Sequence, residues 1–209
     1  MQIIDSLKWR YATKKFDANR FLDDTQIEIL KEAFNLTATS YGLQPIRLVV
    51  IHNKELQEKL VEHSWNQRQV ADASHVLVLC VENTIDKNTV EAYFDRVKAI
   101  RNTPEEILAP FKDFMIDTFS KKTSEELKTW ASKQAYIAMG TLLTVCGAEQ
   151  IDACPMEGFV PEKYDEILGL EAHGLSSALV LPVGYRAEDD MFSSMNKVRK
   201  TVAESVLEL

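Results

Sequence analysis

Glycine is scarce in this chain. Only seven occur among 209 residues, and none belongs to the GxGxxG or GxxxxGK[ST] patterns that cradle phosphate groups. A dinucleotide site of the Rossmann type is therefore not expected. The GxSxG pattern is also missing, and no serine or cysteine has a recognisable nucleophile setting, so hydrolysis by a catalytic triad has little support.

Cysteine and histidine are equally sparse. Cys80, Cys146 and Cys154 are odd in number and form no CxxC pair, which argues against a disulfide framework or a zinc knuckle. We expect three buried thiols. The four histidines lack HxxxH or HxH spacing, so no metal site is predicted.

Long apolar runs and an excess of basic residues are absent too. No stretch approaches the ~20 residues of a membrane span, and residues 1–5 do not begin a signal peptide. A net charge of −8 argues against nucleic acid as a partner. The sequence predicts a cytoplasmic protein without a membrane partner, folded as one domain over residues 1–209.

Hydrophobic periodicity predicts an α+β protein. Apolar strands without alternation suit a sheet covered by helices on both faces. Two helices should begin at capping boxes, Thr25 with Glu28 and Thr123 with Glu126, and the second should stop at Gly147. Helices are expected over 2–7, 25–36, 54–62, 123–147 and 161–168, and strands over 46–52, 75–81, 151–154 and 176–183.

Two segments are less regular. Residues 87–122 are charged and helix-prone, with breaks expected at Pro104 and Pro110, and could form a mobile cover. Residues 185–209, here called the tail, have an apolar side but too little length to fold alone. We expect the tail to clasp a partner subunit.

Basic residues at the two ends of this acidic chain are the main functional signal. Arg10 and Lys14 stand near its start, and Lys197 and Arg199 near its end. Cations gain little from one another, so an anionic ligand is a natural reason to gather them. The alternative is a set of solvated surface residues, with Lys14 paired to Asp17. Cations without a nucleophile favour a reaction carried by a cofactor.

Four segments together resemble one family, the FMN-dependent, oxygen-insensitive NAD(P)H nitroreductases. They are WRYATKKF at 9–16, TSYGLQP at 39–45, PMEGF at 155–159 and KVR at 197–199. The resemblance covers nearly the whole chain. It implies a mixed β-sheet flanked by helices, and an intertwined homodimer with C-terminal strand exchange and an FMN in each interface cleft.

The resemblance also implies residue roles at the cofactor. Arg10, Lys197 and Arg199 would hold the phosphate, helped by backbone groups near Tyr11 and Ala12. Relatives often have Ser at the position of Ala12, so a hydroxyl contact is missing here. A Lys14 ammonium beside the N1 and C2 carbonyl edge would stabilise the reduced, anionic ring, which makes Lys14 a catalytic candidate.

Further cofactor contacts are implied by the remaining motifs. Thr39, Ser40 and Gly42 would reach across from the partner subunit, with Gly42 replacing an Asn found in many relatives. Asn66 would bond the pyrimidine edge. Gln69 stands where relatives commonly carry a second Lys, which predicts a lower flavin potential.

The loop from Pro155 through Met156 to Gly158 would lie on the inner face of the ring. The amides of Glu157 and Gly158 would point toward N5 and the C4 carbonyl, because Pro lacks a donor and Gly permits close approach. Glu157 is the second catalytic candidate, either steering protons or serving only as a hydrogen-bond acceptor.

The implied reaction is hydride transfer from NADH or NADPH to the flavin, followed by two-electron reduction of nitroaromatics or quinones at the same face, with ping-pong kinetics. Phe111 and Phe114 could line the acceptor site, and Arg101 could contact the nucleotide. Three alternatives stay open: a reductase for one metabolite such as a pteridine, quinone or enone, a flavin-binding protein without turnover, and an interaction domain using the long helix.

Overall fold

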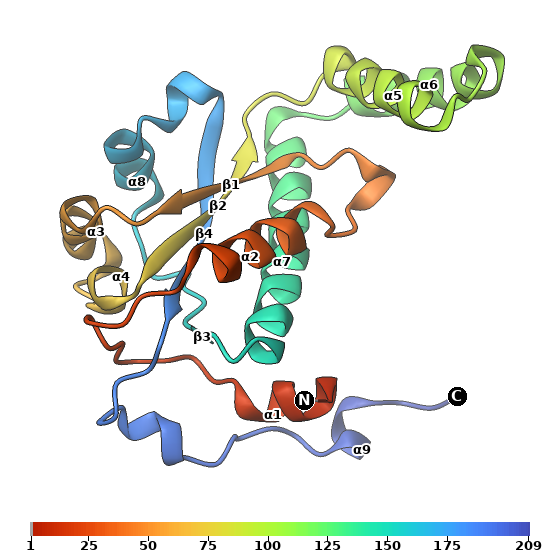
Figure 1. The fold of residues 1–209 in the computed structure, drawn as a ribbon. Coiled ribbons are helices and arrows are strands. Elements are labelled where there is room, and N and C mark those ends of the chain that lie inside the picture. The colour runs from red at the N-terminus through yellow and green to blue at the C-terminus, as the bar shows by residue number, and fades with distance from the viewer. Residues whose placement is uncertain (1) are drawn as a thin grey trace.

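A four-stranded sheet forms the centre of the protein in the computed structural model, which describes residues 2–209 (Figure 1). Its strands are β1 (Ile46–Ile51), β2 (His75–Glu82), β3 (Asp152–Ala153) and β4 (Leu175–Gly184), in the order β1-β2-β4-β3. Each strand is antiparallel to its neighbours, and one isolated parallel bridge joins Ala12 to Ala153. The α+β class is confirmed.

The central strands are apolar without alternation because both of their faces are buried. Side chains of β2 point alternately to the two sides. Leu77, Leu79 and Val81 enter one hydrophobic cluster, and Val76, Val78 and Cys80 enter the other. Each fully buried aliphatic side chain contributes roughly 1.5–3 kcal/mol, so the sheet stabilises both layers at once.

Helices cover the two faces in separate groups (Figure 1). The helices α2 (Asp24–Asn35) and α7 (Ser124–Ala148) pack on one side, whereas α3 (Lys54–Val61), α4 (Gln69–Asp72) and α8 (Pro161–Leu168) lie on the other. The outer edge of β1 pairs with no strand among residues 2–209. That edge is open to another chain.

Local capping explains where two of the helices begin and end. The expected capping box of Thr25 with Glu28 is wrong. The Asp23 carboxylate accepts a hydrogen bond from the Gln26 N–H at 2.8 Å, and the Gln26 side chain accepts one from the Asp23 N–H at 3.2 Å. The box of Thr123 with Glu126 is confirmed. The expected stop at Gly147 is wrong by one residue, since α7 ends at Ala148. Gly147 lies inside the helix, where a side chain would meet the Ser6 carbonyl oxygen at 3.0 Å, so the glycine permits close packing.

Residues 87–120 form a helical hairpin that projects from the sheet (Figure 1). It consists of α5 (Lys87–Arg101) and α6 (Glu105–Ser120). The break expected at Pro104 is confirmed, whereas Pro110 lies inside α6. The carbonyl of Glu106, which loses its helical partner at Pro110, belongs to an exposed residue and can bond water instead.

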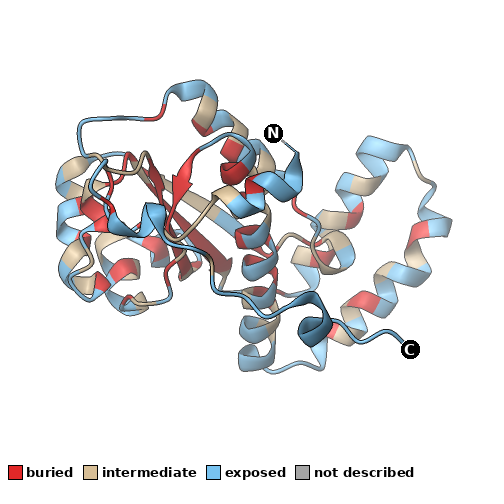
Figure 2. Ribbon diagram, turned by 90° about the horizontal axis from the view of Figure 1, so that it is seen from below, coloured by how far each residue is buried: buried red, intermediate tan, exposed pale blue. Residues whose placement is uncertain are grey.

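The two ends of the chain lie at the same end of the molecule. The first helix, α1 (Ile3–Trp9), and the tail with its short helix α9 (Val202–Ser205) run beneath the sheet (Figures 1 and 2), and the tail surface is exposed. Within residues 2–209 no helix has the length and apolarity to cross a membrane, and no group of side chains could hold a metal ion. All three cysteines are buried, as expected.

Candidate functional site

Arg10, Lys197 and Arg199 meet where α1 ends, and we call these three residues the cation cluster. Burial and then the charge of Arg199 lower the pKa of Arg10. Burial, Arg10 and Arg199 likewise lower the pKa of Lys197. A cavity of about 270 Å³ opens beside Lys197 and is lined also by Trp9 and Tyr11. The tertiary structure therefore gathers cations from both ends of the chain.

The cation cluster fits a phosphate group. The Nε atom of Arg10 is buried and has no hydrogen-bond partner, and no carboxylate within residues 2–209 pairs with any of the three side chains. An unpartnered buried donor beside like charges is costly, whereas a phosphate would accept the bonds and offset the repulsion. An anionic mononucleotide is a suitable ligand.

Asp190 holds the segment that follows Arg10, and sequence reasoning missed it. Its side chain is only 3% exposed. It accepts hydrogen bonds from the Tyr11 hydroxyl at 2.9 Å and from the backbone N–H groups of Lys14, Lys15 and Phe192 at 2.9, 3.2 and 3.1 Å. Burial raises the pKa of Asp190, but these donors together outweigh burial and lower it below its ordinary value.

Replacing Asp190 by asparagine should destabilise the protein by about 2 kcal/mol, because one amide oxygen cannot serve four donors. The folded-state pKa of Asp190 lies below the unfolded value, so its stabilisation is complete above the unfolded pKa and is lost as pH falls through the folded pKa. Urea unfolding of both proteins from pH 3 to pH 7 measures this. If the difference between them stays constant as pH falls, the carboxylate has no such role.

Arg186 is a second residue that the sequence did not reveal. Its Nε donates to the Asp152 carboxylate at 2.7 Å, and its guanidinium lies 4.4 Å from the ring centre of Trp9 and 4.6 Å from that of Tyr11. Planar guanidinium groups stack well on aromatic rings. Arg186 thereby joins β3, the end of α1 and the tail.

The Lys14 side chain is exposed and lies near the loop that begins at Cys154. Burial raises the pKa of the Cys154 thiol, and the charges of Lys14 and then Arg10 oppose that rise. No ion pair within residues 2–209 includes Lys14, so the alternative pairing with Asp17 is not seen. Its ammonium is available to a ligand.

The loop Pro155–Gly158 is held by backbone hydrogen bonds and close packing. Met156 exchanges backbone hydrogen bonds with Val180 in β4 at 2.8 and 3.1 Å. A side chain at Gly158 would lie 2.8 Å from the Trp65 ring and 2.9 Å from the Gln67 amide nitrogen, so a larger residue would require these side chains to move. The N–H groups of Glu157 and Gly158 donate to no acceptor within residues 2–209. Two adjacent free donors can bind a ligand's acceptor edge.

The turn at 62–67 lies beside this loop. Asn66 and Trp65 both have a left-handed backbone, with φ of 58° and 54°. Asn66 is exposed, and Gln69 is largely buried at the start of α4. Trp65, which is 69% exposed beside Gly158, was not predicted as a site residue.

Thr39, Ser40 and Gly42 lie beside the middle of α7, away from the cation cluster. The Ser40 N–H donates to Gln134 of α7 at 2.8 Å, whereas Gly147, 13 residues further along that helix, contacts Arg10. At 1.5 Å per residue this places the two groups about 20 Å apart along the axis. A single chain does not bring the 39–42 segment to the cation cluster.

The predicted substrate contacts accompany the 39–42 segment. Tyr41 is 6.4 Å from Phe111 between ring centres, and Phe111 stacks on Phe114 at 6.1 Å. Both phenylalanines are about half exposed on α6, and Arg101 is exposed at the end of α5. At Gly42 a φ of +71° and the nearby Tyr93 hydroxyl both favour glycine.

The fold is of the α+β class, with an antiparallel sheet between two helical layers. Its cation cluster and the loop with two free amides suit a mononucleotide. Residues 7–185 match the Nitroreductase family, and the chain belongs to that family. The protein YfkO of Bacillus subtilis (strain 168), named as an NAD(P)H nitroreductase, is 32% identical, and the alignment covers 96% of each chain.

Solved structures share the fold. YdfN of Bacillus subtilis, titled a nitroreductase, has a TM-score of 0.88 at 16% identity, covering 100% of this chain and 99% of YdfN. A protein from Exiguobacterium sibiricum 255-15, titled a nitroreductase in complex with FMN, has a TM-score of 0.84 at 19% identity, with 100% and 98% covered.

Proposed function

We propose that this protein is an FMN-dependent oxidoreductase that uses NADH or NADPH to reduce nitroaromatics or quinones. The observation that carries the proposal is the buried, unpartnered Nε of Arg10 within the cation cluster. Bound FMN would supply a ring that accepts and donates a hydride. The donor and the acceptor would use one open face in turn, which gives ping-pong kinetics.

Different residues of this chain would bind the phosphate, orient the ring and stabilise its reduced state. The cation cluster binds the phosphate, and the free amides of Glu157 and Gly158 orient the ring. Lys14 places a positive charge where reduction adds electron density, so it favours the reduced state. Asn66 bonds the ring edge, and the absence of a second Lys at Gln69 weakens the local field.

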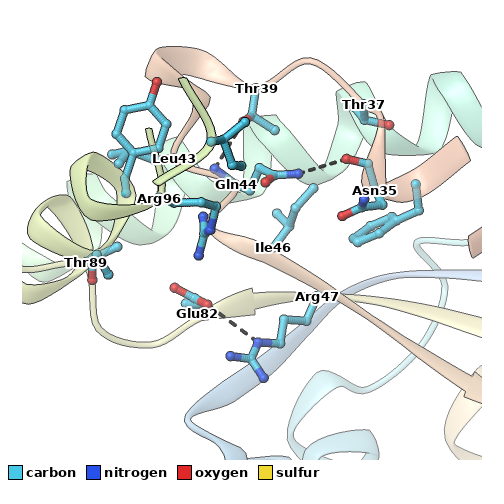
Figure 3. A pocket seen from close by; sticks show the side chains of 14 residues that line it. Asn35, Thr37, Thr39, Leu43, Gln44, Ile46, Arg47, Glu82, Thr89 and Arg96 are labelled. Atoms are coloured by element: carbon cyan, nitrogen blue, oxygen red, sulfur yellow. Dashed lines mark hydrogen bonds and ion pairs between the residues drawn. The ribbon is translucent and has the colours of Figure 1, made fainter. Parts of the chain in front are cut away.

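A second copy of the chain would complete the site. The open edge of β1 adjoins a cavity of about 320 Å³ lined by Lys31, Phe34, Ile46, Arg47, Leu48 and Val50. A cavity of about 710 Å³ continues from it, with Arg47, Arg96 and Gln44 on its walls (Figure 3). This groove combines apolar surface with the positive charges of Lys31 and Arg96, while Arg47 pairs with Glu82 at 3.6 Å.

The tail has the complementary character. Val202, Val206 and Leu207 are 77%, 53% and 81% exposed, and Glu204 and Glu208 carry its negative charge at 201–209. We propose that the partner's tail occupies the groove and extends the sheet at β1. The exchange would bring the partner's 39–42 segment and aromatic hairpin to the flavin.

The function is tested by the spectrum and turnover of the purified protein. Flavin absorption, oxidation of NADH or NADPH, and parallel double-reciprocal plots with a nitroaromatic and a quinone are expected. Turnover of one pteridine, quinone or enone alone would favour the metabolite-specific reductase. Bound flavin without turnover would favour a binding protein, and protein that stays colourless with added FMN would overturn the proposal.

Replacing Lys14 by alanine should lower the flavin reduction potential by about 30–60 mV. The attraction of unit charges at 4 Å is about 4 kcal/mol at an effective dielectric of 20, solvent reduces it here, and about 30 mV corresponds to 1.4 kcal/mol for two electrons. Lys15→Ala is the control, because that neighbouring ammonium pairs with Asp189. Equal potentials in Lys14→Ala and the control would refute the role.

A further inference from the structure

Tyr136 lies on the exposed side of α7 and contacts the flavin-facing loop. Its hydroxyl donates a hydrogen bond to Oε1 of Glu157 at 2.6 Å, although the Tyr136 side chain is 51% exposed overall. The bond to the Glu157 carboxylate, and then burial, raise the pKa of Tyr136. A short bond from a hydroxyl to an ionised acceptor is among the stronger hydrogen bonds in proteins.

The loop 155–158 is held from three directions. Backbone bonds of Met156 attach it to β4. Gln67 donates to the Gly158 carbonyl at 3.1 Å from the turn at 62–67. The bond from Tyr136 attaches it to α7 and is the contact made through the Glu157 side chain.

This third contact acts where the free donors are. The peptide unit between Glu157 and Gly158 carries the free N–H of Gly158, one of the two N–H groups without an acceptor. The Glu157 side chain is attached to the Cα atom at which this peptide unit begins. If the carboxylate rotates freely, the Glu157 backbone has more freedom to tilt those amides. A misplacement of about 1 Å is enough to slow an enzymatic step substantially.

We propose that Tyr136 is a positioning residue of this site: its hydroxyl fixes the Glu157 carboxylate and thereby aims the amides of Glu157 and Gly158 at the flavin ring. The proposal rests on the proposed function. It assigns Glu157 the role of an anchored acceptor. It also assigns the exposed middle of α7 a part in hydride transfer besides any contact with a partner copy.

A purely structural role for Tyr136 predicts a different outcome. Ile137 and Gly140 are exposed near Tyr136 on α7, so Tyr136 could serve only to pack a partner copy. In that case, loss of the hydroxyl would change association or stability, and its effect would add to that of changing Glu157.

The test compares Tyr136→Phe, Glu157→Leu, their double variant and Glu157→Gln. In rapid mixing at saturating NADH, Tyr136→Phe should slow flavin reduction about tenfold, while KM and the Kd for FMN change less than about twofold. Glu157→Leu should match it, and the double variant should be no slower than either. Glu157→Gln should retain most of the rate, because its amide oxygen still accepts the bond.

Tyr185→Phe is the matched control, since it also removes one hydroxyl bonded to a side chain, that of Gln26 at 3.0 Å, away from the loop. It should leave the rate unchanged. Additive effects of Tyr136→Phe and Glu157→Leu, or a wild-type rate in Tyr136→Phe, would overturn the proposal.

A readout without turnover separates this inference from the proposed function. In the flavin-free protein the Phe159 N–H donates to the Glu157 carbonyl at 3.0 Å, and Tyr136→Phe should accelerate hydrogen exchange at Phe159 about tenfold. Unchanged exchange overturns the positioning role even if the wild type is active. Accelerated exchange in a protein that does not reduce any acceptor supports the contact while refuting the reductase.

Discussion

Replacing Arg10 by methionine should weaken FMN binding by about 100-fold or more, so that the protein purifies without colour. Charge-assisted hydrogen bonds contribute about 1.5–3 kcal/mol each, and a guanidinium can make two to one phosphate. The methionine retains an apolar stem beside Gly147 while removing the charge. Fluorescence titration with FMN measures the effect.

The same change should leave the flavin-free protein as stable as the wild type, or more so. Arg10 places a buried, unpartnered Nε next to Arg199, and methionine removes both the desolvation cost and the repulsion. Stability and ligand binding therefore oppose each other at this position. Urea unfolding without FMN is the measurement.

Arg68→Met provides the control. Arg68 is exposed and pairs with Glu58 and Asp72, so the variant loses a guanidinium outside the cation cluster. It should keep its FMN affinity. A protein that binds FMN normally after Arg10→Met would show that the phosphate is held elsewhere, and marked destabilisation of the flavin-free form would show that Arg10 has a structural partner.

Deleting residues 201–209 should convert a dimer into monomers and abolish FMN binding, even though Lys197 and Arg199 remain. Burial of Val202, Val206 and Leu207 in the partner's groove would contribute about 6 kcal/mol before ordering costs. Within one chain the 39–42 segment lies about 20 Å along α7 from the cation cluster, so without the exchange no such segment would contact the flavin phosphate site. Light scattering and flavin absorbance measure both losses.

A point variant tests whether the apolar contacts of the tail, and not merely the length of the chain, hold the dimer together. Leu207→Asp should reproduce most of the deletion, whereas Ser205→Ala, which changes neither an apolar side chain nor a charge of the tail, should remain dimeric. A truncated protein that stays dimeric would refute the groove as the tail's site. A truncated monomer that still binds FMN tightly would refute the two-chain site.

Much of the secondary structure was predictable because it depends on neighbours in sequence. The bounds of α8 match the expected 161–168, and the strands at 46–52 and 75–81 are displaced by at most one residue. The errors are also local. Two overlapping capping patterns compete at the start of α2, and the box of Asp23 with Gln26 forms.

The candidate site was predictable in part. The motifs around Arg10, Lys14 and Gly158 are contiguous in sequence, so a family resemblance can identify them. The contacts of Asp190 were not predictable. Its only local signal is that it caps the short turn after it, whereas one of its partners, Lys14, is 176 residues away in the sequence. Nothing in the order of residues indicates that this carboxylate meets a distant backbone.

Sequence by itself determined the two-faced strands, the buried thiols and the basic residues at both ends, because hydrophobic period and charge are properties of the chain. Only the tertiary structure decided that Arg10 would meet Arg199, that Tyr136 would bond Glu157, and that the 39–42 segment would lie beside the middle of α7, away from the cation cluster. Such contacts depend on how helices pack against a sheet. Packing is decided by the whole core at once, not by any single segment.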